Sequence, residues 1–360
     1  MDESTRLKLA AEVAGVREVF FPYPRVGEIQ KDIHHLHFRD NGVSEGGVLM
    51  LFGESRCGKS RLLGDYAAQY PHQPHAIVKE NGDFADRKEV LLMTVPDAKT
   101  RNLLERLLAL LTNQTTEQVK GSGVRRFDIE EAIVHFATET QLKLLILDEA
   151  HQGISNRTIE ATKDTASVIK NLSNAAQFAL VIAGTMEAQR LLDASPELAG
   201  RVLYEYELAP FSWDVPAERA TFLDVLRALD QHLATNVFGR LSGLAEPETA
   251  LWLNRASLGY VGHAATLIEV AGVMAVVDMA EGRARSLTSD HLFRALAKSP
   301  LRRMVADEMR AALGLPTQNA RHSAAQKASQ SAGRGEEAGD HVTRLRGRAR
   351  RAARGIEFRP

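Results

Sequence analysis

The stretch GESRCGKS, residues 53–60, decides the fold of this 360-residue chain. It has the pattern G-x-x-x-x-G-K-[ST], follows the apolar run VLMLF and leads into a helical run that begins RLLGDYAAQY. Such a turn lets backbone N–H groups at a helix N-terminus surround an anion. We therefore predict a phosphate-binding loop in which Lys59 reaches the β- and γ-phosphates and Ser60 binds Mg²⁺. The alternative is a plain glycine turn followed by a surface lysine.

The predicted nucleotide-binding residues are the loop and the start of the following helix. Cys57, the only cysteine of the chain, lies among them. A helix terminus lowers a thiol pKa, which would permit redox regulation, whereas the alternative is that Cys57 only fills the loop. The predicted set, for ATP, is Gly53, Glu54, Ser55, Arg56, Cys57, Gly58, Lys59, Ser60 and Arg61.

The composition is that of a soluble globular protein, with 44% apolar and 25% charged residues. A single cysteine excludes an intramolecular disulfide framework and fits a reducing compartment. The charged start MDESTRLKLA does not resemble a signal peptide, and Glu269 and Asp278 interrupt the most apolar stretch, residues 264–280. We therefore expect a cytoplasmic protein in which this stretch is a buried helix and not a membrane span.

Apolar runs alternate with helical segments through the first two thirds of the chain. Strands are expected at residues 48–52, 89–97, 142–147, 178–183 and 203–208, with helices at 102–112, after the expected N-cap Asp128, and at 159–176. Such near-continuous apolar strands are typical of a parallel sheet with helices on both faces. The expected fold class is α/β, a five-stranded parallel sheet with nucleotide at its C-terminal edge.

Four regions are expected along the chain. A helical segment at residues 1–40 precedes the nucleotide-binding domain at 41–212. An all-helical lid follows at 213–315, with helices expected at 216–229, 248–256, 263–281, 289–298 and 301–313. Residues 316–360 have the composition of a disordered tail. The last forty residues carry a net charge of +6 and the preceding 320 carry −7, so the tail is expected to bind an anionic partner.

The run LLILDEAH supplies the second half of the predicted site. Asp148, at a strand end, can hold Mg²⁺ through water together with Ser60, and Glu149 can orient the attacking water. Thr185, after the next strand, would sense the γ-phosphate or merely end the strand. The letters DEAH also occur in helicases, but the chain is too short for two helicase lobes with accessory regions. His151 therefore receives no role from the sequence.

Arg201 stands just before the fifth expected strand. Ring-forming ATPases place there the arginine that completes a neighbouring subunit's site. The alternative is a surface ion pair, which would contribute little.

Together, GESRCGKS, LLILDEAHQ, VIAGTMEA and LAGRVLYEYEL resemble the AAA+ ATPases, and most closely the transposition ATPases of the TniB family, with relatives TnsC and MuB. The resemblance implies an ATP-bound homo-oligomer, a ring or helical filament, on double-stranded DNA. It further implies a DDE transposase and a TniQ-type adaptor as partners, with Mg²⁺-dependent ATP hydrolysis driving disassembly.

The resemblance also assigns roles by position. Lys59 and Ser60 bind nucleotide and metal, and Asp148 and Glu149 serve hydrolysis. Thr185 is sensor one, and Arg201 is the finger that acts on a neighbouring subunit. One departure is that Gly262 and His263 stand where a sensor-two arginine is expected, so lid closure on the γ-phosphate is in question unless His263 substitutes.

In such assemblies DNA contacts come from segments after the second strand and before the third. The basic candidates there are Lys99, Arg101, Lys120, Arg125 and Arg126. Their contacts to phosphates would be independent of base sequence, and a solvated surface is the alternative for each.

Two other classes of function remain open from the sequence. The first is a STAND-type P-loop scaffold, in which nucleotide gates protein partners without DNA. The second is a small-molecule kinase, for which the sequence offers no acceptor-binding lid motif.

Overall fold

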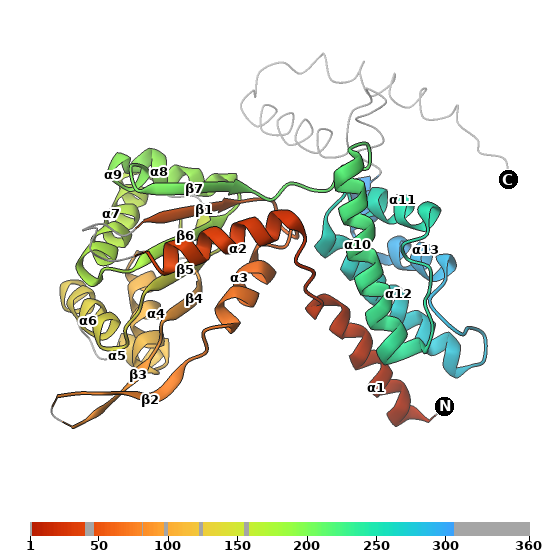
Figure 1. Cartoon of the computed structure of the whole chain (residues 1–360), viewed down its shortest axis with the longest axis horizontal. Helices are drawn as coiled ribbons and strands as arrows, with labels where there is room; N and C mark the ends of the chain where they lie inside the picture. The colour runs from red at the N-terminus through yellow and green to blue at the C-terminus, as the bar shows by residue number, and fades with distance from the viewer. Residues whose placement is uncertain are drawn as a thin grey trace, which may run out of the picture. The chain divides into compact units, whose positions relative to one another are not determined.

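Five parallel strands form the central sheet, in the order β4-β5-β6-β1-β7 (Figure 1). β1 pairs with β6 and β7, and β5 pairs with β4 and β6, all in parallel register. The five-stranded parallel sheet expected from the sequence is confirmed. The strands are β4 (Val90–Thr94), β5 (Leu144–Asp148), β6 (Ala179–Gly184), β1 (Val48–Phe52) and β7 (Val202–Glu207).

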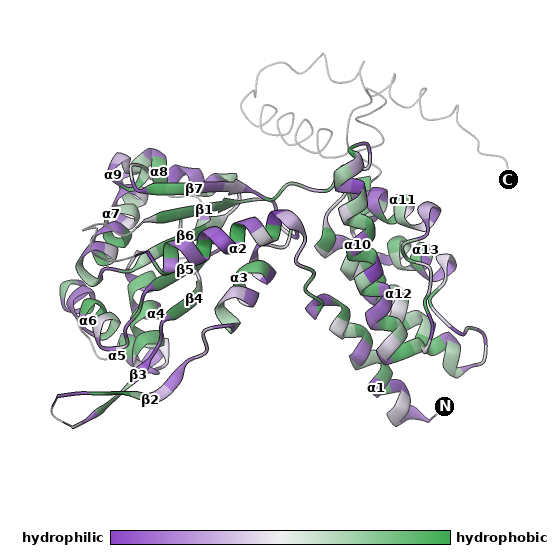
Figure 2. Ribbon diagram, viewed as in Figure 1, coloured by the Kyte–Doolittle hydropathy of each residue, from purple (hydrophilic) through white to green (hydrophobic). Residues whose placement is uncertain are grey.

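Successive residues of each central strand point to opposite faces of the sheet, and both faces are buried. Val48, Met50 and Phe52 face one hydrophobic cluster, whereas Leu49 and Leu51 face the other. Figure 2 accordingly colours the central strands hydrophobic along their length, whereas α2 alternates between hydrophobic and hydrophilic residues. This double burial explains why the strands read as continuous apolar runs in the sequence.

Two groups of helices cover the two faces. One face packs against α4, α6 and α7, and the other packs against α2 and α3. The bounds are α2 (Pro24–His37), α3 (Lys59–Ala68), α4 (Thr100–Thr112), α5 (Thr116–Gly121), α6 (Arg126–Glu139), η2 (Ala150–Gly153), α7 (Ile159–Ala176), η3 (Met186–Ala188), α8 (Gln189–Ala194) and α9 (Pro196–Ala199).

The start of α6 differs from the expectation that Asp128 caps it. The helix begins three residues earlier than expected, and Arg125 occupies the N-cap position. Arg126, its first residue, is held by Glu130 and by both carboxylate oxygens of Asp164. Asp128 instead lies in the first turn, where a negative charge favours the positive end of the helix dipole.

An antiparallel hairpin, β2 (Gln73–Val78) and β3 (Phe84–Arg87), follows α3 and was not expected. Most of its side chains are exposed, so it lacks the apolar run that marks the central strands. The sequence Asn-Gly at residues 81–82 is typical of hairpin turns and is the signal that could have predicted this hairpin.

The helices after the sheet form a separate hydrophobic cluster, which we call the lid. α1 and η1 also belong to this cluster through Val13 and Val16, and a Cβ at Gly272 of α12 would lie 2.8 Å from Val13. The bounds are α1 (Glu3–Ala14), η1 (Gly15–Glu18), α10 (Pro216–Leu233), the π-helix η4 (Ala234–Phe238), α11 (Pro247–Ala256), α12 (Val261–Ala280) and α13 (Ser289–Lys298).

α12 is long and apolar enough to cross a membrane by length and composition, but half of its apolar window is buried inside the protein. Among the described residues it is the one helix that meets these criteria. Ile268, Ala271 and Val276 pack in the lid cluster. This packing agrees with the expected buried helix at residues 264–280.

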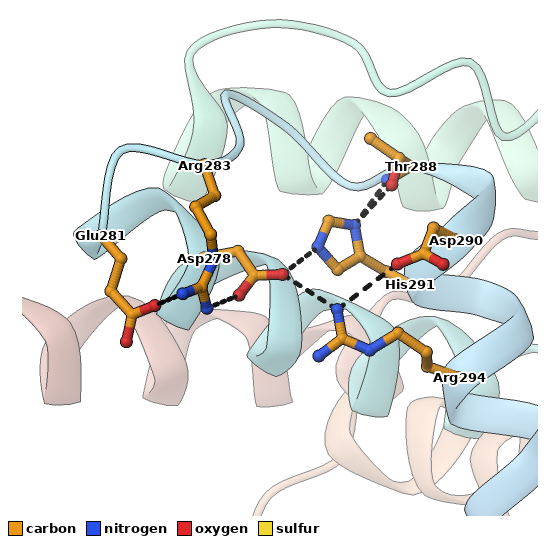
Figure 3. Close-up of polar contacts among 7 residues, drawn as sticks. All are labelled: Asp278, Glu281, Arg283, Thr288, Asp290, His291 and Arg294. Carbon is orange, nitrogen blue, oxygen red and sulfur yellow. Dashed lines mark hydrogen bonds and ion pairs between the residues drawn. The ribbon is translucent and has the colours of Figure 1, made fainter.

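A polar cluster joins the end of α12 to α13 (Figure 3). Asp278 contacts Arg283 at 2.5 Å, Arg294 at 3.0 Å and His291 at 3.1 Å. Hydrogen bonds from Arg283 and then Arg294 hold the pKa of the Asp278 carboxyl far below its usual range. His291 accepts a hydrogen bond from the backbone N–H of Thr288, so the turn before α13 is fixed to the same cluster.

The computed structural model describes residues 2–39, 47–80, 82–96, 100–121, 125–154 and 158–305. Residues 1–299 form one unit, and Pro300 begins a second. The helix expected at residues 301–313 is described only through residue 305. The expected tail, residues 316–360, lies outside the described residues, so its disorder remains a prediction.

Candidate nucleotide site

The phosphate loop connects β1 to α3 at the C-terminal edge of the sheet. Gly53 donates its backbone N–H to the carbonyl of Gly184, the last residue of β6, at 3.1 Å. A Cβ at Gly53 would lie 2.7 Å from Cys57 Sγ and 2.8 Å from the carbonyl oxygen of Leu208, so only glycine fits there. Gly58, with φ of 105°, turns the chain into α3.

Lys59 is the first residue of α3 and is 4% exposed. Its ammonium donates to the carbonyl oxygens of Gly53 at 2.7 Å and Glu54 at 3.0 Å. These bonds hold the positive charge inside the loop, beside the backbone N–H groups that would face a phosphate.

Cys57 is buried within the same loop. Burial raises the pKa of its thiol, and the nearby Lys59 ammonium only partly offsets this effect. The thiol therefore stays protonated at neutral pH, which contradicts the lowered pKa considered for redox regulation and favours the interpretation as loop filler.

Asp148 and Glu149 follow the buried run of β5. Asp148 is 4% exposed, and its carboxylate accepts the backbone N–H of Glu149 at 2.9 Å. Glu149 has φ of 57° and ψ of 36°, the left-handed conformation that is uncommon for residues other than glycine. Strain of this kind costs about 1–3 kcal/mol and clusters at functional sites. The left-handed conformation of Glu149 turns the chain into η2 immediately after β5.

Thr185 comes into the site because β6 lies between β1 and β5. It directly follows Gly184, whose carbonyl bonds to Gly53. On the other side, a Cβ at Gly184 would lie 3.3 Å from the backbone nitrogen of His151. The ends of the three strands therefore bring the phosphate loop, Thr185 and the segment after Asp148 to one edge of the sheet.

A cavity of about 500 Å³ opens at this edge. Glu149 and residues 55–62 line one side of it, and mostly apolar residues from the N-terminal segment and the lid line the rest. Burial, with a smaller effect of Cys57, raises the pKa of Tyr23 to about 12, so its phenol is neutral. The remaining lining residues are Val16, Arg17, Val19, Phe20, Phe21, Tyr23, Val26, Val225, Leu229, Val261, Gly262 and Ala265.

Two ion pairs connect the N-terminal segment, which lines part of the cavity, to α12 and α3. Arg17 pairs with Glu269 of α12, and Glu18 accepts from Arg61 of α3 at 2.6 Å. Adjacent residues of η1 thus reach to the lid and to the helix that follows the phosphate loop. These N-terminal and lid residues were not among the predicted site residues, because no local motif marks them.

The lid touches the phosphate loop directly at Gly262. Its backbone N–H donates to the carbonyl oxygen of Arg56 at 3.0 Å. His263 instead contacts the carbonyl of Ser257 within the lid, at 3.3 Å from Nδ1. Burial lowers the pKa of His263, so its ring is neutral at pH 7 and does not supply the positive charge of an arginine.

Replacing Gly262 by alanine should weaken nucleotide binding about tenfold. The added Cβ would lie 2.7 Å from the carbonyl oxygen of Arg56, and such overpacking costs about 1–3 kcal/mol. Isothermal titration with ATP measures the effect. Gly64→Ala is the control, because nothing lies within 4 Å of its Cβ position in α3. Unchanged affinity in the Gly262 variant would mean that this contact does not support nucleotide binding.

Arg201 lies apart from this site. It precedes β7, and its carbonyl oxygen accepts the N–H of Val48, the first residue of β1, at 3.0 Å. The phosphate loop follows the other end of β1. Arg201 is 9% exposed, and its guanidinium donates to Asn174 of α7. Arg201 is therefore remote from the nucleotide site of its own chain, and its role as a finger for a neighbouring subunit stays a prediction.

The predicted DNA contacts differ in their surroundings. Lys99 lies outside the described residues. Arg101 pairs with Glu105 at 2.7 Å, and Arg126 is held by Glu130 and Asp164. Lys120, in α5, and Arg125, at the start of α6, are exposed, and within the described part of the chain no acidic side chain pairs with either.

Comparisons with known proteins agree with this architecture. The model of the family described as bacterial TniB protein matches residues 14–210, and no curated protein matches the chain. The ORC1 protein of Aeropyrum pernix in complex with DNA is 14% identical, with a TM-score of 0.51 over 96% of this chain and 83% of that chain. The ORC2 protein of Aeropyrum pernix, with ADPNP and ADP, is 17% identical, with a TM-score of 0.49 over 78% and 68%.

At these identities the structural likeness concerns the fold alone, whereas the family match covers more than half of the chain. It spans the phosphate loop, Asp148, Glu149, Thr185 and Arg201. The chain therefore belongs to the bacterial TniB family and is an AAA+ P-loop ATPase.

Proposed function

We propose that this protein is a cytoplasmic, DNA-dependent ATPase that regulates transposition. It assembles on target double-stranded DNA as a homo-oligomer, a ring or a helical filament, and recruits or activates a DDE transposase with a TniQ-type adaptor. ATP hydrolysis then drives disassembly. The observation that carries the proposal is the cavity that phosphate-loop residues and Glu149 line together.

The residues at this edge of the sheet fit ATP with Mg²⁺. The cavity combines an apolar portion, suited to a base, with the cationic loop that holds Lys59. The Ser60 hydroxyl and the Asp148 carboxylate are oxygen donors of the kind that Mg²⁺ prefers. No cluster of three or more His, Cys, Asp or Glu side chains in the described ranges could hold a metal. Few protein ligands are the rule where phosphates supply the other oxygens.

Each residue has a defined task in hydrolysis. Lys59 and the loop N–H groups bind the phosphates, and bound Mg²⁺ would neutralise charge on the phosphate oxygens. Glu149 orients a water molecule and accepts its proton as the water oxygen bonds to the γ-phosphorus. The bond from that phosphorus to the bridging oxygen breaks, and ADP carries the charge away. We assign the contact to the γ-phosphate to Thr185, because the preceding Gly184 accepts a hydrogen bond from Gly53 of the phosphate loop.

A direct test combines imaging with phosphate release. The purified chain is incubated with ATP, with and without duplex DNA, and Lys59→Ala serves as the variant without phosphate binding. We expect DNA-dependent oligomers and DNA-stimulated hydrolysis in the wild type and neither in the variant. ATP-driven particles that ignore DNA would instead support the STAND-type scaffold.

Charge reversal at Lys120 and Arg125 should weaken DNA binding strongly. The slope of log affinity against log salt changes by about 0.9 for every phosphate that a side chain neutralises, so the double variant Lys120→Glu/Arg125→Glu should lower the slope by about 2 per protomer. The control is Arg6→Glu/Lys8→Glu, which makes the same charge change at exposed positions of α1. Fluorescence anisotropy on duplex DNA across a salt series measures both. Equal slopes in the two double variants would contradict the proposed binding of phosphates by Lys120 and Arg125.

A further inference from the structure

We propose that His151 is a positioning residue that couples the main chain at Thr185 to the carboxylate of Glu149. The proposal rests on the proposed function, because it assigns His151 a task in ATP hydrolysis. It gives a role to the last letter of DEAH, which the sequence motif alone leaves without one.

Two contacts place the imidazole between the two residues. His151 Nδ1 lies 3.4 Å from the backbone nitrogen of Thr185, which donates its N–H to it. His151 Nε2 lies 3.4 Å from Glu149 Oε2. Gly184 leaves room for the ring, because a Cβ there would approach His151 Nδ1 to 3.3 Å and Ala188 to 3.0 Å. The side chain of His151 is 18% exposed and that of Glu149 is 29% exposed, so neither is freely solvated.

The two contacts require one protonation pattern. A nitrogen that accepts the Thr185 N–H carries no proton, so Nδ1 is the acceptor. A neutral ring then carries its proton on Nε2 and can donate it to Glu149. The imidazole thus bridges a fixed donor on one strand end to the carboxylate on another.

The local backbone keeps this bridge short. Gln152 donates its N–H to the carbonyl of Glu149 at 2.9 Å, and Ile154 donates to the carbonyl of His151 at 3.1 Å. These bonds form η2, which places His151 two residues after the strained Glu149. A shift of the main chain at Thr185 therefore moves the ring, and the ring moves the carboxylate.

This coupling connects the residue at the γ-phosphate to the group that activates water. When Thr185 engages a γ-phosphate, His151 holds Glu149 in the orientation for proton transfer. Without the bridge, Glu149 retains its chemistry but samples other orientations. Misplacement of a catalytic group by about 1 Å can cost on the order of 100-fold in rate.

Three substitutions separate the contact of His151 with Thr185 from its contact with Glu149. In His151→Asn, the amide oxygen takes the place of Nδ1 but the side chain is too short to reach Glu149. In His151→Gln, the longer side chain can donate to Glu149 from the place of Nε2. His151→Leu fills the space and makes neither bond.

The readouts are kcat and KM for ATP, with ATP affinity from titration and Tm as checks on folding. We expect kcat to fall by about 10- to 100-fold in the Asn and Leu variants, with KM unchanged within about twofold. His151→Gln should recover kcat to within about threefold of wild type. The split between kcat and KM, together with rescue by glutamine, is not expected if His151 only fills space.

Three results would overturn the coupling: a leucine variant as fast as wild type, a glutamine variant as slow as the leucine variant, or a loss of kcat that follows a loss of ATP affinity. A lack of hydrolysis by the wild-type chain, equal to that of Lys59→Ala, would instead refute the proposed ATPase function. The two failures are thus distinguishable.

Discussion

The Glu149→Gln variant is expected to bind ATP with unchanged affinity while its hydrolysis falls by about 10²- to 10⁴-fold. Glutamine has nearly the same shape, but its amide cannot accept the proton of the attacking water, and loss of a general base has this magnitude. Lys59 and the phosphate loop, which are proposed to bind the nucleotide, are untouched. Because disassembly is proposed to need hydrolysis, oligomers of this variant should persist on DNA.

Three measurements check this expectation: ATP titration, phosphate release and the lifetime of DNA-bound oligomers. Glu160→Gln is the matched control, since Glu160 is an exposed residue in the first turn of α7. It should behave as the wild type. Rapid turnover by Glu149→Gln would rule out Glu149 as the base.

Arg201→Ala should retain ATP binding by the isolated chain but lose about 10³- to 10⁵-fold of hydrolysis within the assembly. An arginine supplied to a phosphoryl-transfer site from outside the chain has this effect. Its position before β7, at the sheet edge opposite the phosphate loop, excludes action on its own nucleotide. The role therefore depends on a neighbouring copy of the chain.

Arg201 also donates a hydrogen bond to Asn174 of its own chain. The loss of this bond must therefore be distinguished from the loss of action on a neighbouring subunit. Asn174→Ala removes the acceptor of the Arg201 guanidinium and leaves the arginine in place. This control should keep most of the hydrolysis. Mixing Arg201→Ala with Glu149→Gln should restore part of the activity, because the second variant still assembles and supplies an intact arginine to the first variant's intact nucleotide site. No recovery on mixing, with both variants assembled, would contradict action in trans.

Much of the sheet and part of the site follow from local sequence patterns. β1 and β5 are buried on both faces, so they appear as unbroken apolar runs with the phosphate loop and Asp148 at their ends. The bounds of α7 and α13 match the predicted helices at residues 159–176 and 289–298. Each of these strands and helices can be predicted because its buried residues are consecutive or periodic within one segment.

The remaining features depend on contacts between distant segments. The cavity side formed by the N-terminal segment and the lid joins residues more than 200 positions apart, such as Val16 and Ala265. His151 gains its surroundings only when β5 and β6 are paired. The β2–β3 hairpin is mostly exposed, so no apolar pattern in the sequence predicts it.

Val13 packs against Gly272, so the folded unit begins before the first residue of the family match. A truncated chain that starts at residue 14, where the family match begins, would remove α1 and uncover that part of α12. The same helix carries Val261, Gly262 and Ala265 to the cavity. An amino-terminal truncation at the start of the family match should therefore disturb the cavity proposed to bind the nucleotide.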